Sequence, residues 1–420
     1  MPGTVEEIKK ILAICNQNKI ALVPSGGRTG YSGGATAEHG EVIISLARLH
    51  KIKSVDVSDR TMVCEPGVTT EAVRLEAAKH GLFYPVDFAS KGSSHIAGNV
   101  ATNAGGIRVI RYGNTRDWVL GLKVITAAGE ELALNGALYK NATGYDLRNL
   151  FIGSEGTLGI ITEVTLKLTS PPKDFTTALC GISDAAACLQ LLRALRSAGC
   201  TVNVIEYFER NALELVVAHA GLLDPFRAAH AAYVLLEVET EFPAQRERFA
   251  ELMLELVESK VLADAVVAES QKQQQNLMAL RERISETIGR QHVPHKNDIA
   301  VPVSSLPQFL SAFRECLRAN FPNFELIIFG HVGDGNLHVN ILKPKGMDEK
   351  TFFAACDQVD TKTFEVVQKF NGTISAEHGV GLLKKPYLHF TRSAQEIELM
   401  KKIKRLFDPN GILNPGKIFD

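Results

Sequence analysis

The chain has 420 residues, and its 46 Lys and Arg against 47 Asp and Glu give a formal net charge of −1. This length suggests two or three domains, and 45% hydrophobic with 22% charged residues excludes disorder, collagen and coiled coil as overall classes. The near-zero charge gives no broad electrostatic reason to bind nucleic acid or an anionic membrane. An anionic ligand is therefore expected at a local cluster of cations.

The seven cysteines are scattered and form no C-x-x-C pair, which is typical of buried thiols in a reducing compartment. Residues 1–10 lack the basic and apolar regions of a secretory signal, and no apolar run approaches the roughly 18 residues of a membrane span. We therefore expect a cytoplasmic protein without a transmembrane segment.

The elements expected up to residue 170 form one α+β domain. Apolar residues at helical spacing predict helices over 5–15 and 70–79. The apolar and β-branched runs that predict short strands lie at 21–24, 42–46, 52–57, 62–64, 119–127 and 131–134. The last two flank Ala128-Gly129-Glu130, a hairpin signal.

Pro171 and Pro172 mark a domain boundary, because two prolines remove two ladder donors and stiffen the exit from a strand. Beyond them, long helices are expected at 185–197, 243–261, 269–290, 305–320 and 394–407, with strands at 231–238, 325–329 and 338–342. This alternation predicts a second α+β domain with an antiparallel sheet. We divide the chain into residues 1–170, 171–370 and a C-terminal segment, 371–420.

Glycine is concentrated in four loops of the first domain, at 24–35, 85–95, 98–106 and 153–159. Small residues let backbone N–H groups approach a flat or extended ligand closely, as in phosphate cradles. A tight turn explains any one such loop, but four in one domain are hard to explain as turns alone and favour a flat or extended ligand. No G-x-G-x-x-G motif occurs, so a Rossmann NAD site is not expected.

Two histidines lie in a strand-like segment, residues 330–340. If 333–336 form a hairpin loop, His331 pairs with His338, and directly opposed residues have Cβ atoms about 5 Å apart. Two imidazoles so placed can hold one divalent metal. The alternative is two histidines packed on a sheet.

Glu377 and His378 supply a carboxylate and a third imidazole. Adjacent residues of an extended segment face opposite ways, so one could bind metal while the other faces substrate. Two histidines and one carboxylate with an open position suit catalytic zinc as well as non-haem iron, and zinc is favoured because no iron-specific feature is visible. The alternative is a surface pair in a glycine turn.

A third group supplies positive charge. Arg281 and Ser285 would share a helix face at i, i+4, and Lys296 follows. We interpret them as the local cluster that an anionic substrate needs, and a solvated charged helix is the alternative.

Together these motifs, over essentially the whole chain, resemble the flavin-dependent 2-hydroxy-acid dehydrogenases of the vanillyl-alcohol-oxidase type. Within that family the segments 330–338 and 375–379 are most similar to the branch that acts on D-2-hydroxyglutarate, since other branches more often have Gly where this chain has Ala376. The resemblance implies an α+β fold with a two-subdomain FAD-binding domain, an α+β cap domain with an antiparallel sheet and a metal site, and a C-terminal helical segment.

The resemblance also implies roles for individual residues. The residues implied to contact FAD are Pro24, Gly26, Gly27, Arg28, Thr29, Gly30, Ser93, Ser94, Gly98, Asn99, Thr102, Ala104, Gly105, Gly106, Glu155, Gly156, Ile160 and Asn414. The implied ligands of a divalent metal, zinc by preference, are His331, His338 and Glu377. The implied catalytic base is His378, and the implied substrate contacts are Arg281, Ser285, Lys296 and Asn340. Ser285 replaces an expected threonine but keeps the hydroxyl. No histidine lies in the 26–34 loop, so FAD is expected to be non-covalent.

The implied reaction is oxidation of D-2-hydroxyglutarate to 2-oxoglutarate by hydride transfer to the flavin. Two alternatives stay open: a dehydrogenase of D-lactate or another D-2-hydroxy acid, and a flavin- or metal-binding protein without turnover. The implied electron acceptor is an electron-transfer flavoprotein or a quinone. For the oligomeric state, a homodimer is one alternative that stays open. Relatives usually carry further residues before Pro2, so we expect either a truncated start or an FAD domain without those elements.

Overall fold

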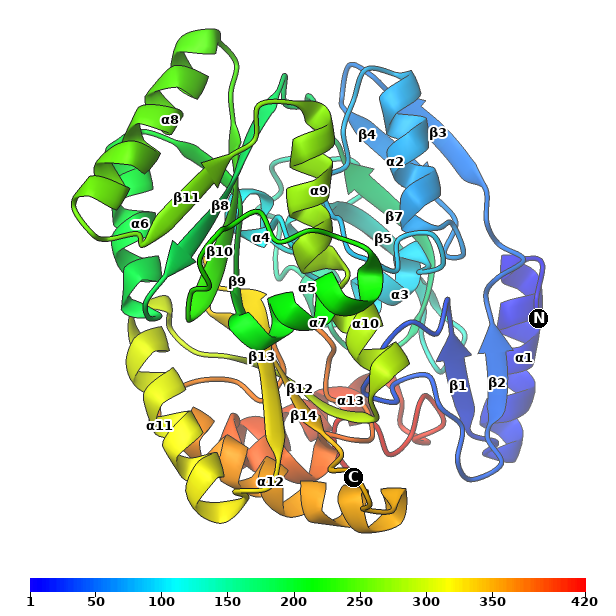
Figure 1. Ribbon diagram of the computed structural model, residues 1–420. Helices are drawn as coiled ribbons and strands as arrows, with labels where there is room; N and C mark the ends of the chain where they lie inside the picture. The colour runs from blue at the N-terminus through cyan, green and yellow to red at the C-terminus, as the bar shows by residue number, and fades with distance from the viewer. The chain divides into compact units, whose positions relative to one another are not determined.

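The computed structural model describes residues 1–420, which form two compact units. One unit consists of Met1–Arg108, Tyr112–Pro171 and Glu377–Asp420, and the other of Val109–Arg111 and Pro172–Ala376. Each combines helices with a largely antiparallel sheet, so the predicted α+β class is confirmed (Figure 1). None of the helices combines the length and apolar composition that crossing a membrane requires.

The first unit contains a parallel strand pair and a five-stranded antiparallel sheet in the order β3-β4-β7-β5-β6. The strands are β1 (Leu22–Ser25), β2 (Val42–Ser45), β3 (Ile52–Asp56), β4 (Thr61–Cys64), β5 (Val119–Ile125), β6 (Glu131–Leu134) and β7 (Ile160–Lys167). The helices are α1 (Val5–Asn18), α2 (Thr70–Lys79), α3 (Ile96–Thr102), α5 (Arg148–Phe151), α13 (Ala394–Phe407) and the 3₁₀ turns η1 (Thr115–Trp118) and η3 (Lys385–Phe390). Helix α4 (Val109–Tyr112) runs through the short segment assigned to the second unit.

Helix α1 shows how the sequence builds the edge of this unit. The Thr4 side chain caps its N-terminus, and Ile8, Leu12 and Cys15 form one buried face at helical spacing. That face packs against β1 and β2 in a cluster that includes Leu413. Residues near the C-terminus therefore pack beside β1, where the glycine-rich loop at 26–34 begins.

The second unit contains one seven-stranded antiparallel sheet in the order β11-β8-β10-β9-β13-β14-β12. The strands are β8 (Phe175–Ile182), β9 (Thr201–Glu209), β10 (Ala232–Glu239), β11 (Asp264–Val267), β12 (Pro294–Ala300), β13 (Glu325–His331) and β14 (Asn336–Leu342). The helices are α6 (Ala186–Ser197), α7 (Arg210–Ala220), α8 (Pro243–Glu258), α9 (Gln271–Glu282), α10 (Ile284–Gln291), α11 (Leu306–Asn320), α12 (Glu349–Lys369) and the turn η2 (Val303–Ser305).

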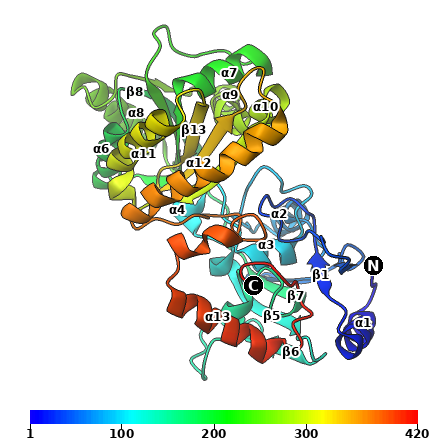
Figure 2. The same ribbon diagram turned by 90° about the horizontal axis from the view of Figure 1, so that it is seen from below.

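Helices cover both faces of this sheet. Helices α7, α9 and α10 lie on one face, and α6, α8, α11 and α12 lie on the other (Figure 2). The first face holds a buried apolar cluster in which Phe208 stacks on Tyr233. The polar residues described below share this face with that cluster.

The helix predicted over 269–290 is wrong as a single element. The chain forms α9 and α10, with Arg283 between them. The Thr287 hydroxyl donates to the Arg283 carbonyl at 2.7 Å, and such back-bonding to residue i−4 bends helices.

Candidate active site

Strand register places a row of polar side chains on one face of the second unit's sheet. His331 lies opposite Glu206, His338 opposite Asp298, and Asn340 opposite Lys296. Directly opposed residues share a face, and residues two apart along a strand do so as well. Four neighbouring strands, β9, β13, β14 and β12, therefore contribute to one polar surface.

The pairing of His331 with His338 across a hairpin is wrong. His338 lies opposite Phe329, because β13 continues to His331, which pairs with β9 instead. Gly335 adopts φ +86° in the connecting turn. His331 is two residues beyond Phe329 and hence on the same face, so the two imidazoles are diagonal neighbours rather than opposed ones.

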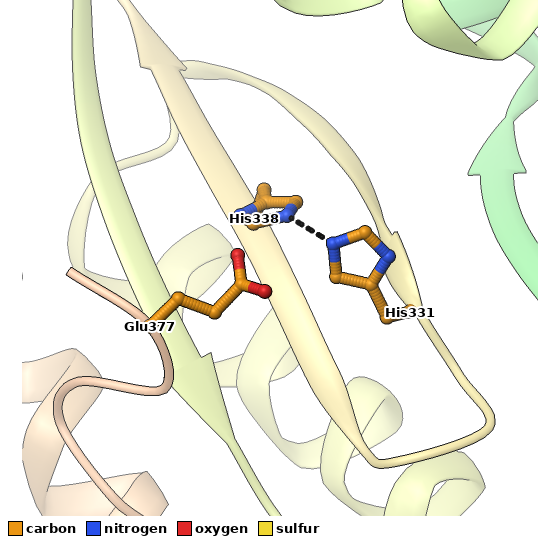
Figure 3. Close-up of side chains that lie close together, drawn as sticks. All are labelled: His331, His338 and Glu377. Atoms are coloured by element: carbon orange, nitrogen blue, oxygen red, sulfur yellow. Dashed lines mark hydrogen bonds between the residues drawn. The ribbon is translucent and has the colours of Figure 1, made fainter. Parts of the chain in front are cut away.

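The two imidazoles nevertheless lie close together, as the sequence led us to expect. Their Nε2 atoms are 3.3 Å apart, and their rings are edge-on with centroids separated by 5.1 Å. The Glu377 carboxylate points toward them, and one ligand atom from each of these three residues lies within 4.8 Å of the others (Figure 3). Glu377 directly follows Ala376, whose N–H donates to the Asp298 carbonyl of β12 at 3.2 Å.

This donor set fits a divalent cation. Tetrahedral zinc with Zn–N bonds of 2.0–2.1 Å places two nitrogen ligands about 3.3 Å apart. The observed Nε2–Nε2 distance of 3.3 Å matches that separation. Two imidazoles and one carboxylate also leave a fourth position for substrate or water.

Carboxylates on the far side of each ring select which nitrogen faces the centre. The His331 Nδ1 lies 2.5 Å from Glu206 Oε1, and the His338 Nδ1 lies 3.5 Å from Asp298 Oδ1. A proton on each Nδ1 leaves the two Nε2 lone pairs directed at one another, the arrangement in which imidazoles bind a metal.

Glu206 is fully buried, and its second oxygen, Oε2, lies 2.7 Å from the Arg281 guanidinium. Burial alone would raise the pKa of Glu206, but its contacts with His331 and Arg281 outweigh this effect and hold that pKa below its usual range. Arg281 also stacks over the Phe329 ring at 4.5 Å. Its side chain is therefore engaged by Glu206 and Phe329.

The other residues that we expect to contact substrate lie near one another. Lys296 Nζ is 3.4 Å from Ser285 Oγ, and Asn340 is the register partner of Lys296. Burial lowers the pKa of Lys296. Asn340 Nδ2 donates to the Ile327 carbonyl at 3.3 Å. Arg281 and Ser285 lie on separate helices rather than on one helix face, and they contact different partners.

The glycine-rich loops of the first unit meet near the end of β1. A Cβ on Gly27 would lie 2.1 Å from the Ser93 carbonyl oxygen, and one on Gly156 would lie 3.1 Å from Pro24 Cγ. Cβ atoms on Gly30 and Gly98 would meet nothing within 4 Å. Some of these glycines thus allow loops to pack tightly, whereas others border open space that a ligand can approach.

Asn414 links these loops to the C-terminal segment. Its Nδ2 donates to the Glu155 carbonyl at 2.6 Å and to the Gly34 carbonyl at 2.9 Å. Its Oδ1 is buried without a hydrogen-bond partner, as are His95 Nδ1 and Ser25 Oγ. Buried polar atoms without partners are costly, so these three fit a site that a polar ligand completes.

Several residues expected to contact FAD also make contacts within the protein. Ser94 and Asn99 hydrogen-bond to Thr70 at 2.8 and 2.6 Å, and the Gly106 N–H donates to Glu377 at 2.6 Å. Ile160 is buried in the cluster under α1. The remaining residues expected to contact FAD in these loops are Gly26, Arg28, Thr29, Thr102, Ala104 and Gly105.

His378 lies against the first glycine-rich loop. Its ring contacts the Tyr31 ring edge-on, with centroids 5.1 Å apart, and its carbonyl accepts a hydrogen bond from the Ser32 hydroxyl. The neighbouring residues Val380 and Gly381 donate backbone hydrogen bonds to Glu155. The imidazole is thus held beside the loop that we expect to bind FAD.

Sequence reasoning missed Glu206 and Asp298. Glu206 lies in the strand segment 201–209, whose neighbours are almost all buried. A carboxylate is rarely fully buried unless it is paired, so a charged residue inside a buried strand is the signal that would have identified it. Tyr31 and Ser32 carried no comparable signal, because they lie in a glycine-rich turn.

Comparison with known proteins identifies two domains. Residues 1–135 match an FAD binding domain, and residues 171–418 match the C-terminal domain of FAD linked oxidases. The chain is 48% identical to the D-2-hydroxyglutarate dehydrogenase of Stutzerimonas stutzeri (strain A1501), over 100% of this chain and 90% of that protein. It is 36% identical to the mitochondrial D-2-hydroxyglutarate dehydrogenase of Arabidopsis thaliana, over 100% of this chain and 74% of that protein.

Solved structures agree on the fold. A p-cresol methylhydroxylase with substrate bound superposes with a TM-score of 0.79 at 17% identity, covering 100% of this chain and 88% of the other. An alkyldihydroxyacetonephosphate synthase gives 0.73 at 17% identity, covering 99% and 76%. With the domain matches, these likenesses confirm the resemblance to vanillyl-alcohol-oxidase-type flavoproteins, and the chain belongs to the family of FAD-linked oxidases.

Proposed function

We propose that this protein is an FAD-dependent dehydrogenase that oxidises D-2-hydroxyglutarate to 2-oxoglutarate with the help of a divalent metal. The observation that carries the proposal is the convergence of His331, His338 and Glu377 beside a sheet face that also presents Lys296 and Asn340. Two relatives with 48% identity are named D-2-hydroxyglutarate dehydrogenase, and they support the choice of substrate.

We infer that His331 Nε2, His338 Nε2 and the Glu377 carboxylate hold the metal, and that the glycine-rich loops with Asn414 hold FAD. When bound, FAD accepts a hydride, and a cation such as zinc supplies the Lewis acidity that lowers the pKa of a bound hydroxyl. The nitrogen-rich donor set favours zinc over magnesium or calcium, which prefer oxygen ligands.

His378 is the proposed catalytic base. Its imidazole takes the proton of the substrate C2 hydroxyl, while the C2 hydrogen leaves with its electron pair as a hydride. The substrate thereby loses two hydrogens and two electrons and becomes the 2-oxo acid. The Tyr31 ring contacts the imidazole, and the Ser32 hydroxyl donates to the His378 backbone carbonyl, so together they hold His378 in place for this transfer.

Lys296 is the proposed partner of the distal C5 carboxylate. Its ammonium group is half-buried beside the Ser285 hydroxyl, so both can donate to one carboxylate oxygen pair. A charge-assisted hydrogen bond there distinguishes a dicarboxylate from D-lactate, which lacks the second carboxylate.

The ion pair of Arg281 with Glu206 supports a second candidate. Because that arginine is already neutralised, fewer cations remain for a distal carboxylate. This favours, as the alternative, a dehydrogenase of D-lactate or another D-2-hydroxy acid with the same chemistry.

Anaerobic mixing of the FAD-loaded protein with hydroxy acids tests the proposal. D-2-hydroxyglutarate should bleach the flavin absorbance fastest, D-malate and D-lactate more slowly, and L-2-hydroxyglutarate should serve as the inactive stereochemical control. Faster bleaching by D-lactate would favour the second candidate. A yellow protein that no hydroxy acid bleaches would be a flavin-binding protein without turnover. Reoxidation of the bleached protein by an electron-transfer flavoprotein or by a quinone then identifies the acceptor that we propose.

A further inference from the structure

Glu206 lies between a histidine and an arginine and contacts both. Neither a structural ion pair nor a substrate contact requires this arrangement. Its Oε1 lies 2.5 Å from His331 Nδ1, and its Oε2 lies 2.7 Å from Arg281 Nη2. The carboxylate is fully buried at the centre of the sheet. It therefore connects a residue of the proposed metal group to a buried cation.

A buried carboxylate is costly unless its charge is compensated and its oxygens are hydrogen-bonded. Arg281 supplies the compensation, and it is itself buried and stacked on Phe329. Hydrophobic residues would fill this space at lower electrostatic cost, as they do in the adjoining cluster of Phe208 and Leu280. The charged arrangement thus needs a reason beyond stability.

Orientation of His331 is that reason. Neutral imidazole carries one proton, on Nδ1 or on Nε2, and a carboxylate accepts only from a protonated nitrogen. With the proton fixed on Nδ1 by Glu206, the Nε2 lone pair faces His338 Nε2, 3.3 Å away. With the proton on Nε2, the same nitrogen could not accept a metal ion.

We propose that Glu206 is a positioning residue that fixes the tautomer and ring orientation of His331 for metal binding, with Arg281 as its counter-ion. This inference deepens the proposed function, because it concerns the same metal group. It requires neither a particular hydroxy acid nor flavin reduction.

Zinc affinity of the full-length, FAD-loaded Glu206→Gln variant tests the proposal. Competition with a chromophoric chelator should show Zn²⁺ binding weakened about 10–100-fold relative to wild type, the usual effect of removing a partner of a metal-bound histidine. In protein stripped of metal, ¹⁵N-histidine NMR should show His331 as the Nδ1–H tautomer in wild type and as a mixture in the variant, with His331→Gln used to assign the signal.

Glu209→Gln is the matched control. Glu209 lies on the same strand and pairs with Arg314, but it makes no contact with the histidines. It should change neither the zinc affinity nor the His331 tautomer. If both variants bound zinc equally weakly, the loss of any charge in this strand would weaken zinc binding. That result would overturn the proposal.

A double variant keeps the test valid if Glu206→Gln alone folds poorly with Arg281 left uncompensated. Glu206→Gln combined with Arg281→Met removes both charges, and it should regain thermal stability while zinc binding stays weak. Wild-type zinc affinity and an unchanged tautomer in a folded Glu206 variant would overturn the inference. Because flavin reduction is not measured, this failure is distinct from a failure of the substrate assignment.

Discussion

The carboxylate of Glu155 accepts a hydrogen bond from the backbone N–H of Val380 at 2.7 Å. Its other oxygen accepts one from the N–H of Gly381 at 2.8 Å. A side chain at Gly379 would bring a Cβ within 2.7 Å of the same carboxylate. Glu155 thereby fixes the segment that begins at His378, although the two residues are far apart in the sequence.

Replacing Glu155 with Gln should loosen this segment. An amide has one acceptor oxygen, so one of the two backbone N–H groups loses its partner, at a cost of about 1–3 kcal/mol. We expect a lower melting temperature and a lower kcat with D-2-hydroxyglutarate, measured by thermal unfolding and by flavin reduction. Glu163→Gln, a carboxylate of β7 that pairs with Lys53 and Lys123, is the control and should keep its kcat. An unchanged kcat in Glu155→Gln would mean that the position of His378 does not depend on this contact.

The His378→Gln variant should keep its flavin but lose most of its turnover. Proton transfer by a positioned base contributes about 10²–10⁴ in rate, and glutamine cannot accept the hydroxyl proton at neutral pH. Stopped-flow flavin reduction measures the loss, and the visible flavin spectrum reports whether the cofactor site is intact. Flavin reduction at the wild-type rate would remove His378 from the mechanism.

Lys296→Met should affect a dicarboxylate far more than a monocarboxylate. The variant removes the ammonium group that we assign to the C5 carboxylate and keeps the length of the side chain. KM for D-2-hydroxyglutarate should rise strongly, whereas kinetics with D-lactate should change little. Equal losses with both substrates would show that Lys296 does not recognise the distal carboxylate.

Lys296 should also give substrate binding a dependence on pH. Burial lowers the pKa of this lysine, so its ammonium form is lost at a lower pH than that of an ordinary lysine. KM for D-2-hydroxyglutarate should therefore rise as the pH rises through this lowered pKa. The Lys296→Met variant lacks the titrating group and should lose this rise. If the rise persists in the variant, another group causes it.

Sequence patterns predicted β13 and β14, which carry the two histidines, but missed β9 and β12, which lie beside them in the sheet. Other elements with strong local signals were predicted. Helix 70–79 ends at Lys79 as expected, and the hairpin at Ala128-Gly129-Glu130 connects β5 and β6. The long helix α12 was missed, although Phe352, Cys356 and Val359 are buried at helical spacing. This spacing, with polar residues between the buried ones, is the pattern of an amphipathic helix, so the sequence did contain the signal.

The site itself was predictable where motifs are local and was missed where it depends on pairing between strands. The proximity of His331 and His338 could be anticipated from their spacing. Their register could not, because it depends on the pairing of β13 with β9, far away in the sequence. Glu206 joins the site only through that pairing, and Arg281 only through the packing of α9 on the sheet.

The ion pair between Lys404 and Asp408 should stabilise the C-terminal segment that carries Asn414. Asp408 is buried and accepts the N–H groups of Ile412 and Leu413 at 3.0 and 2.7 Å, while the Lys404 ammonium contacts Asp408 and the Leu413 carbonyl. Lys404→Met leaves a buried carboxylate without its cation, which costs about 3–5 kcal/mol of unfolding free energy.

Chemical denaturation measures this loss, and Lys402→Met is the control. Lys402 is exposed on the same helix, so its replacement should change the unfolding free energy by less than about 0.5 kcal/mol. The double variant Lys404→Met with Asp408→Asn removes both charges, so it should lose less stability than Lys404→Met alone. A larger loss in the double variant would show that Asp408 acts through its backbone contacts to Ile412 and Leu413 rather than through the ion pair. Because Asn414 follows Leu413 directly and donates to Glu155 and Gly34, the Lys404 variant should also bind FAD more weakly than the Lys402 control.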